Sequence, residues 1–338
     1  MKVLVTGGGG FLGKAIVRML LERGDSVRSF SRSAHPELTD LGVEHGCGAL
    51  EDAAAVARAC DGCDIVFHVA AKAGVWGPYD DFYRANVTGT ANVIAACREQ
   101  SIGRLVYTSS PSVVFDGSDM EGVDESVPYP EHFEAFYPQT KAAAERLVLQ
   151  ANDASLATVA LRPHLIWGPG DNHLVPRILE RGRKGALRKI GTKPCLVDTI
   201  YVDNASRAHL QAADRLAVGS PVAGKAYFLS QGEPLPVWEV VNRILAAGNL
   251  PPVRRTISPR LAYAAGALLE TIYRLFSLPG EPRMTRFLAK ELSTAHWFEL
   301  SAARRDFGYD PQVSFDEGMD RLKRSLEQRV KITFKQDF

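Results

Sequence analysis

The chain has 338 residues, of which 46% are hydrophobic and 23% are charged, and its formal net charge is +1. This composition is typical of a globular enzyme with one large or two smaller domains, and the near-neutral charge argues against a nucleic-acid partner. The five cysteines are odd in number and scattered, which argues against a disulfide framework and predicts a reducing, cytoplasmic compartment. No signal-peptide pattern precedes the first predicted strand, and no uncharged apolar run reaches the roughly 18 residues of a membrane span.

The first thirteen residues predict a buried strand, a glycine turn and the start of a helix. An apolar run at 2–6 leads into Gly7-Gly8-Gly9-Gly10-Phe11-Leu12-Gly13, and a helical apolar pattern begins at Ala15. Glycine permits positive φ and leaves room for a pyrophosphate against the N–H groups of a helix start. We therefore expect a dinucleotide to bind at Gly7, Gly10, Phe11, Leu12 and Gly13; the alternative is a plain glycine turn.

The end of the second predicted strand, 26–30, indicates which dinucleotide binds. An acidic residue at this position would bind the ribose hydroxyls of NAD(H), whereas this chain has Ser31-Arg32. An arginine pairs with a 2′-phosphate and a serine hydroxyl donates to it, so the pair predicts NADP(H) in preference to NAD(H). The alternative is that Arg32 is a solvated loop residue.

The next stretch predicts two more strands, near 43–45 and at 64–69, around an alanine-rich helix. The Cys60-Asp-Gly-Cys63 spacing is interpreted as a turn rather than a redox or metal site, and His68 as a satisfied core residue. At Ala70, Ala71 and Lys72 we expect the backbone to approach the cofactor closely. A helix that contains Asn86 is predicted from about Tyr79 to Gln100.

Three side chains form a coherent set for carbonyl reduction. Ser110 follows the strand at 105–108, while Tyr137 and Lys141 lie four residues apart at the start of a helix and share one face. Tyr137 is predicted to donate the proton in reduction and accept it in oxidation, Lys141 to lower the tyrosine pKa and hold the nicotinamide ribose, and Ser110 to bind the substrate oxygen. Serine hydrolysis is disfavoured because no Gly-x-Ser-x-Gly elbow is present.

The alternation of strands and helices predicts an α/β fold, a Rossmann-type doubly wound parallel sheet with a smaller, interleaved C-terminal substrate-binding domain. The dinucleotide-binding domain is predicted over 1–165, with 196–230 returning to it through a strand at 196–202, a helix at 204–216 and a strand at 226–229. The predicted substrate domain comprises 166–195 and 231–330.

These motifs together resemble the extended short-chain dehydrogenase/reductases over nearly the whole chain. The glycine motif, Ser110, Tyr137, Lys141 and Asn86 match that family, and Asn86 is the asparagine that supports the active-site backbone in it. The segments 68–71, 107–110, 161–164, 168–171 and 201–204 resemble its 3β-hydroxysteroid dehydrogenase-type branch. The resemblance implies cofactor contacts at Pro163 and a homodimer formed through the helices that hold Asn86 and Tyr137.

Two departures from the family pattern leave questions open. The family commonly has an aspartate that binds adenine where this chain has Ala49, so apolar stacking near Leu50 is expected instead. Two neighbouring serines, Ser109 and Ser110, compete for the role of the substrate-binding hydroxyl.

Segments 72–77 and 293–298 are similar to members of this branch from bacterial long-chain olefin biosynthesis. That resemblance implies reduction of the 3-oxo group of a 2-alkyl-3-oxo fatty acid to the 3-hydroxy acid. A 3β-hydroxysteroid or sterol dehydrogenase is the alternative enzyme, and an NADP(H)-sensing regulator is the non-enzymatic alternative.

Two later stretches bear on the substrate and on partners. The basic segment Arg177 to Lys193 either faces an anionic substrate or forms a solvated helix face. Trp167, Leu174 and the amphipathic helix 261–276 are hypothesised to line a long apolar pocket. That helix can alternatively pack in the core or a dimer, lie on a membrane surface, or bind partner enzymes.

Overall fold

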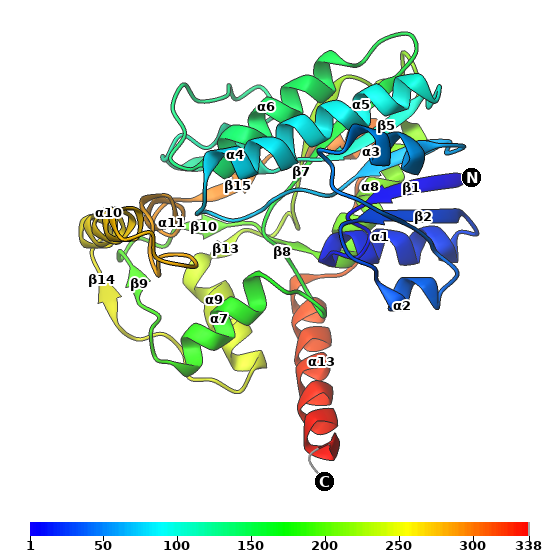
Figure 1. Cartoon of the computed structure of the whole chain (residues 1–338). Helices are drawn as coiled ribbons and strands as arrows, with labels where there is room; N and C mark the ends of the chain where they lie inside the picture. Colours follow the sequence, from blue (N-terminus) through cyan, green and yellow to red (C-terminus); the bar gives the residue numbers. More distant parts are fainter. Residues whose placement is uncertain (337–338) are drawn as a thin grey trace.

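A seven-stranded parallel sheet organises the chain in the computed structural model, which describes residues 1–336 (Figure 1). Strands β1 and β4 lie side by side at its centre, with Val3 opposite Ile65 and Thr6 opposite His68. This order confirms the predicted doubly wound fold. Across the sheet the strands are β12 (Lys225–Leu229), β7 (Ala157–Pro163), β5 (Arg104–Thr108), β4 (Ile65–His68), β1 (Lys2–Thr6), β2 (Ser26–Ser31) and β3 (Glu44–Cys47).

Helices cover both faces of the sheet and enclose two apolar cores. Alternate residues of β1 point to opposite faces, so Val3 and Val5 join one core and Leu4 joins the other. Burial on both faces explains why the strands are apolar almost throughout. The first core lies under α1 (Phe11–Glu22) and α8 (Val202–Arg215), the second under α3 (Ala53–Cys60), α5 (Gly89–Glu99) and α6 (Phe136–Gln150); the short α2 (Pro36–Thr39) follows β2.

A smaller four-stranded sheet lies beside the strand ends of the large sheet. The helices that surround the smaller sheet are at the left of Figure 1. Its strands come from distant parts of the sequence: β6 (Met120–Val123), β10 (Leu196–Val197), β13 (Leu235–Pro236) and β15 (His296–Phe298). The helices around it are α7 (Leu174–Arg183), α9 (Val237–Ala247), α10 (Pro259–Leu275) and α11 (Arg286–Glu291). Two short strand pairs complete this region, β8 (Ile166–Trp167) with β11 (Ile200–Tyr201) and β9 (Lys189–Ile190) with β14 (Thr256–Ile257).

The last two helices connect the two regions. Helix α12 (Ser301–Phe307) contacts α8 and β12 of the large-sheet region, although its residues were expected in the substrate domain, and α13 (Phe315–Gln336) contacts α9. The predicted single strand at 196–202 is wrong, because β10 pairs within the smaller sheet whereas β11 pairs with β8.

The predicted helix from about Tyr79 to Gln100 is confirmed, with an irregular turn inside it. The structure divides it into α4 (Tyr79–Phe82), a π-helical turn η1 (Tyr83–Thr88) and α5. A π-turn adds one residue per hydrogen-bonded ring and is common beside functional sites, and apolar periodicity does not reveal it.

The turn predicted at Asp61–Cys63 is confirmed between α3 and β4, and all five cysteines are free. His68 is confirmed as a satisfied core residue, because its two ring nitrogens lie 2.8 Å from the Thr6 hydroxyl and 3.0 Å from the Thr90 hydroxyl. Over the described residues, we find no helix with the length and apolar character that crossing a membrane requires.

Candidate active site

Two adjoining cavities lie where the large sheet meets the smaller region. The first, of about 650 Å³, follows the carboxyl ends of the parallel strands, and the second, of about 370 Å³, extends between α7, α9 and α11. Ligands of open α/β sheets bind along this edge. The residues that line both cavities mark their junction: Ala73, Ser110, Tyr137, Leu165 and His173.

The glycine turn forms one wall of the first cavity with no space for side chains. Gly7 has φ +71°, and a Cβ there would lie 2.9 Å from the Ala70 Cα atom. A Cβ at Gly13 would lie 2.1 Å from the Gly7 carbonyl oxygen. The first turn of α1 carries no acidic residue and no side-chain cap, so its N–H groups remain available to an anion. The turn therefore fits a pyrophosphate.

The remaining predicted cofactor residues also line the first cavity. The side chain of Arg32 is exposed and makes no ion pair with any residue that the structure describes. The Ser31 hydroxyl donates to the Ser33 carbonyl at 2.8 Å, and Leu50 packs so closely on Gly89 that a Cβ there would be 2.6 Å away. The full set is Gly7, Gly10, Phe11, Leu12, Gly13, Ser31, Arg32, Leu50, Ala70, Ala71, Lys72, Tyr137, Lys141 and Pro163.

Asn86 fixes the backbone beside this cavity from within the π-turn. Its side-chain oxygen accepts from the Lys72 N–H at 2.7 Å, and its amide donates to the Lys72 carbonyl at 3.1 Å and to the Thr140 hydroxyl at 3.0 Å. Asn86 thus ties the segment after β4 to the helix that carries Lys141. The Lys72 ammonium is paired separately with Asp81 at 2.9 Å.

Tyr137 and Lys141 occupy one face of α6, and both are governed by burial. Desolvation raises the pKa of Tyr137 to about 12; the Ser110 hydroxyl opposes this shift and Glu291 adds to it. Desolvation also lowers the pKa of Lys141 to about 7, against the attraction of Glu145. The Lys141 ammonium donates to the Thr108 carbonyl at 2.6 Å and lies 4.1 Å from the Tyr107 ring centroid. In this structure burial sets the direction of the Tyr137 pKa shift, which is upward, whereas Lys141 was predicted to lower that pKa.

The two serines after β5 differ in where they point. Ser110 lines both cavities, and its hydroxyl lies 2.9 Å from that of Ser112. Ser109 is only 4% exposed and lines the first cavity alone, and its hydroxyl helps to lower the pKa of the Glu145 carboxyl. Ser110 is thus the hydroxyl that faces the second cavity.

The second cavity has mostly apolar walls and a row of basic side chains. Arg177 and Arg181 lie four residues apart on one face of α7, His173 directly precedes this helix, and all three line the cavity. Arg177 pairs with Glu281 at 2.7 Å, whereas burial lowers the pKa of Arg181, as do the charges of its arginine neighbours. The basic segment therefore has two sides: Arg177 and Arg181 line the cavity, whereas Arg183 and Lys184 are exposed to solvent.

The pocket hypothesis based on Trp167 and the helix 261–276 is wrong, although Leu174 does line the cavity. Trp167 is fully buried, donates to the Thr199 hydroxyl at 2.9 Å and packs against Phe315 in a separate core. Three leucines of α10, namely Leu261, Leu268 and Leu275, instead face outward. The alternative of core packing is confirmed for the other side of this helix, where the buried Ala262 joins a small core with Ile190 and Ala289.

Several residues of the junction carried no signal in the sequence. His173 precedes α7 at the junction, and Glu291 of α11 lines the second cavity beside it; burial raises the pKa of Glu291 to about 7. Leu165 adopts φ +45°, a left-handed conformation that is costly for a branched side chain, at the point where the cavities meet. Only tertiary structure brings these residues to the strand ends.

A buried ion pair anchors the helix that carries Tyr137 and Lys141. Arg162 of β7 holds the Glu145 carboxylate through two hydrogen bonds, at 2.6 and 3.0 Å, and Tyr129 donates a third at 2.6 Å. Arg162 and Glu145 are 3% and 0% exposed. Because Glu145 lies one turn beyond Lys141, this pair fixes the position of both candidate catalytic side chains relative to the sheet.

Comparison with known proteins assigns the family. A 2-alkyl-3-oxoalkanoate reductase of Stenotrophomonas maltophilia is 57% identical over 96% of this chain and 99% of its own. The mouse sterol-4-alpha-carboxylate 3-dehydrogenase, decarboxylating, is 36% identical over 96% of this chain and 91% of its own. Among solved structures, the UDP-glucose 4-epimerase of Thermus thermophilus in complex with NAD has a TM-score of 0.71 and 25% identity, with 97% of this chain and 99% of that chain covered.

A family model for the 3-beta hydroxysteroid dehydrogenase/isomerase family matches residues 4–256. The match spans the glycine turn, both strand-end serines, Tyr137 and Lys141, and most of the second cavity. The chain therefore belongs to the 3-beta hydroxysteroid dehydrogenase/isomerase family, a branch of the extended short-chain dehydrogenase/reductases, and is an oxidoreductase.

Proposed function

We propose that this protein uses NADP(H) to reduce the 3-oxo group of 2-alkyl-3-oxo fatty acids to the 3-hydroxy group. The observation that carries the proposal is the junction of the two cavities, where Ser110 and Tyr137 face both the dinucleotide-type site and the apolar site. The name and 57% identity of the Stenotrophomonas relative support the substrate class.

In this proposal, Tyr137 supplies the proton and Ser110 holds the substrate oxygen. The nicotinamide, when bound, supplies a hydride to the carbonyl carbon. As the C=O bond becomes a C–O single bond, the oxygen gains charge that the Ser110 hydroxyl stabilises by donating a hydrogen bond. A Tyr137 pKa of about 12 keeps the phenol protonated at neutral pH, which suits a proton donor in the direction of reduction.

The preference for NADP(H) rests on Ser31 and Arg32 at the end of β2. The exposed Arg32 side chain, without an acidic partner in the described part of the chain, suits a 2′-phosphate. The glycine turn suits the pyrophosphate that both dinucleotides share, and the Thermus epimerase with 25% identity binds NAD. Thus the preference for the phosphorylated cofactor depends on Ser31 and Arg32 alone.

The basic face of α7 supports an acidic substrate. In a 2-alkyl-3-oxo acid, the carboxylate is separated from the reacting carbonyl by a single carbon, so both groups bind near the junction. His173 lines both cavities there, and Arg177 lies one turn further along α7. The apolar walls of the second cavity then accommodate the alkyl chains.

A 3β-hydroxysteroid or sterol dehydrogenase is the second candidate, and the mouse relative with 36% identity supports it. Arginines lining the second cavity favour a substrate with a carboxylate over an uncharged steroid, and the 57% identity of the Stenotrophomonas relative favours the fatty acid over a sterol carboxylate. The third hypothesis is a regulator that only senses NADP(H). This hypothesis does not explain why Ser110 and Tyr137 meet at a substrate-sized cavity.

We further propose a cytoplasmic homodimer formed through α5, α6 and the turn before them. Tyr79, Tyr83 and Phe136 are exposed large aromatics that cluster there, with ring centroids 5.4 and 5.7 Å apart. Such a cluster on a helical face is typical of a subunit interface. Five free cysteines support the reducing compartment.

The test is oxidation of NADPH by the purified protein with a 2-alkyl-3-oxo fatty acid and a 3-oxosteroid as separate substrates. Because 3-oxo acids lose CO₂ spontaneously, the reverse reaction with the stable 2-alkyl-3-hydroxy acid and NADP⁺ provides an independent measurement. We expect turnover of the fatty acids in both directions; turnover of the steroid alone supports the sterol dehydrogenase instead.

The matched variant for this test is Tyr137→Phe, which removes a single oxygen atom. We expect turnover to fall by a factor on the order of 10² or more, with cofactor affinity within a few-fold of wild type. Unchanged turnover would remove Tyr137 from the mechanism. Absence of turnover by the wild type with both substrates would favour the regulator.

A further inference from the structure

Helix α10 presents an apolar face to solvent. Leu261, Leu268 and Leu275 are 58%, 62% and 74% exposed, and their spacing of seven residues places them on one side of the helix. Phe276 and Leu278 continue this surface beyond the helix end, at 65% and 41% exposure. We refer to these five residues as the α10 apolar face. Scattered exposed leucines are ordinary, but five large apolar side chains gathered on one element indicate a binding surface.

The opposite side of α10 packs tightly against the rest of the protein, which fixes the outward orientation of this face. A Cβ on the buried Gly266 would lie 2.6 Å from the Thr285 backbone, so the helix cannot rotate or move away without losing this contact. Glu270, the single acidic residue of α10, is turned inward. It accepts from the Arg286 backbone and guanidinium at 2.7 and 2.8 Å.

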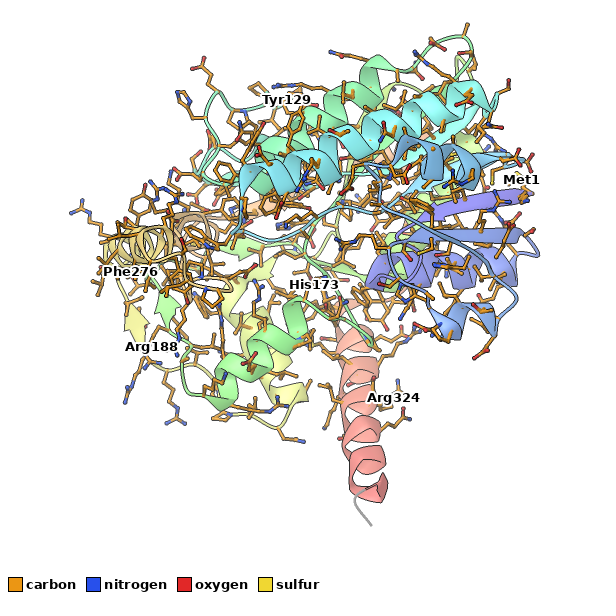
Figure 2. The ribbon with its side chains drawn as sticks, in the orientation of Figure 1. Met1, Tyr129, His173, Arg188, Phe276 and Arg324 are labelled. Carbon is orange, nitrogen blue, oxygen red and sulfur yellow. The ribbon has the colours of Figure 1, made fainter. Side chains whose placement is uncertain are left out.

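The surroundings of the α10 apolar face are cationic. Exposed Arg260 and Arg274 lie along one flank of the helix. The strand pair β9 and β14 packs under its N-terminal end through Ile190 and Ala262, and brings further basic side chains to the same end of the molecule. In Figure 2, Phe276 and Arg188 mark this end, far from Met1. The additional cations are Arg188, Lys189, Arg254 and Arg255.

The packed side of α10 adjoins the wall of the second cavity. Trp76 contacts Tyr273 edge-on, with ring centroids 6.2 Å apart, and the Arg274 guanidinium lies 5.3 Å from the Trp76 ring. The residues just before Trp76, from Ala73 to Val75, line that cavity. A volume of about 370 Å³ is at the small end of cavities that enclose a drug-sized ligand. Long alkyl chains therefore need apolar surroundings beyond it.

We propose that the α10 apolar face docks on the surface of a membrane that contains anionic lipid, with the leucines among the acyl chains and the arginines at the headgroup phosphates. An interfacial helix of this kind has leucine and phenylalanine on one side, arginine or lysine at its margins and low net hydrophobicity. Docking holds the helix that packs on the wall formed by 73–76 at the lipid surface. The further step, that the substrate enters from the lipid, rests on the proposed function.

The experiment is flotation of the full-length protein with vesicles of phosphatidylcholine alone and of phosphatidylcholine mixed with phosphatidylglycerol. We expect binding to the mixed vesicles, weaker binding to the neutral ones, and weakening by salt. Leu268→Glu and Leu275→Glu should each lower the partition coefficient at least about tenfold. The matched control is Leu41→Glu, which adds the same charge at a leucine that is 50% exposed beyond α2 and should leave binding unchanged.

The charge contribution has its own matched pair of variants. Arg254→Gln with Arg260→Gln should weaken binding to the mixed vesicles severalfold, whereas Arg207→Gln with Arg215→Gln, two exposed arginines of α8, should not. Failure of the wild type to float with mixed vesicles, or equal flotation of Leu268→Glu, overturns the proposal. If Leu268→Glu instead dissociates an oligomer in sedimentation and no form floats, the face is a protein interface. Flotation is measured without substrate, so its outcome is independent of whether the proposed reduction occurs.

Discussion

Glu291 is an acid in a setting that disfavours its charge. It lies in the wall of the second cavity beside Tyr137, and burial raises its pKa to about 7 from an ordinary value of 4.5. Other ionisable groups on the same wall are His164 and His296, whose pKa values burial lowers, and the basic residues of α7. A neutral Glu291 offers an O–H donor to the cavity, and an ionised one repels an anionic substrate.

Replacing Glu291 by Gln should make the protein less sensitive to alkaline pH. The folded protein keeps the Glu291 proton up to about pH 7, whereas the unfolded chain releases it near 4.5, so wild-type stability falls as pH rises between these values. At pH 8 the variant should be more stable than wild type by up to about 3 kcal/mol. The unfolding midpoints of both proteins, compared from pH 4.5 to 8, provide the check. A gap that does not change with pH contradicts the shifted pKa.

Arg177→Gln tests whether α7 recognises a carboxylate. The KM for a 2-alkyl-3-oxo acid should rise by about tenfold or more, because a charge-assisted hydrogen bond is lost, while kcat changes little. The KM for the corresponding ketone without a carboxylate should stay the same. Lys184→Gln, on the exposed side of the same helix, is the control. Equal effects on acid and ketone would show that Arg177 has only a structural role.

Sequence reasoning worked best for residues tied to strand ends. Ser110, Tyr137 and Lys141 were expected together because the carboxyl ends of parallel strands meet at one edge, and the structure brings all three to the first cavity. Their catalytic roles stay predictions. Glu291 and His173 could not be found in this way, because their positions depend on how the smaller region folds and on no fixed spacing.

At the scale of elements, α6 is held to β7 by a pair of charges rather than by apolar packing alone. Glu145 and Arg162 are almost completely buried, and two hydrogen bonds join them, with Tyr129 as an additional donor to the carboxylate. Removing one member of such a pair leaves the other charge buried and uncompensated.

Glu145→Gln should therefore destabilise the protein by roughly 3 kcal/mol and displace the start of α6. Thermal and urea unfolding midpoints measure the first effect, and a fall in kcat without a comparable rise in KM measures the second. The control is Glu180→Gln, which removes an exposed pairing with Lys184 and should leave the midpoint unchanged. If both variants behave alike, the buried pair does not anchor α6.

Two features at this scale could not be predicted from apolar periodicity. The segment 79–100 has the apolar pattern of one helix, and the π-turn that places Asn86 changes its hydrogen bonding without changing that pattern. The amphipathic pattern at 261–276 identified a helix correctly but assigned its apolar face to the pocket. Amphipathicity shows that two faces differ and does not show which one is buried.

At the scale of the whole molecule, cofactor binding should stabilise the large-sheet region. NADPH should raise the thermal unfolding midpoint more than NADH at equal concentration, because tighter binding to the folded state gives the larger shift. Arg32→Asp should reverse that order, and Arg58→Gln, an exposed arginine of α3 outside the first cavity, should not. Unchanged selectivity in Arg32→Asp removes this arginine from the account of cofactor choice.

The smaller sheet is assembled from four separated stretches of chain, near residues 120, 197, 235 and 297. Between the first three of these stretches the chain returns to the large sheet and its helices, so no single cut releases the substrate cavity with its walls intact. Exchanging a contiguous segment between relatives would therefore mix walls from two different cavities. New substrate preferences in this lineage are best sought through scattered point substitutions along α7, α9 and α11, and recombination of whole segments should yield mostly inactive chimaeras.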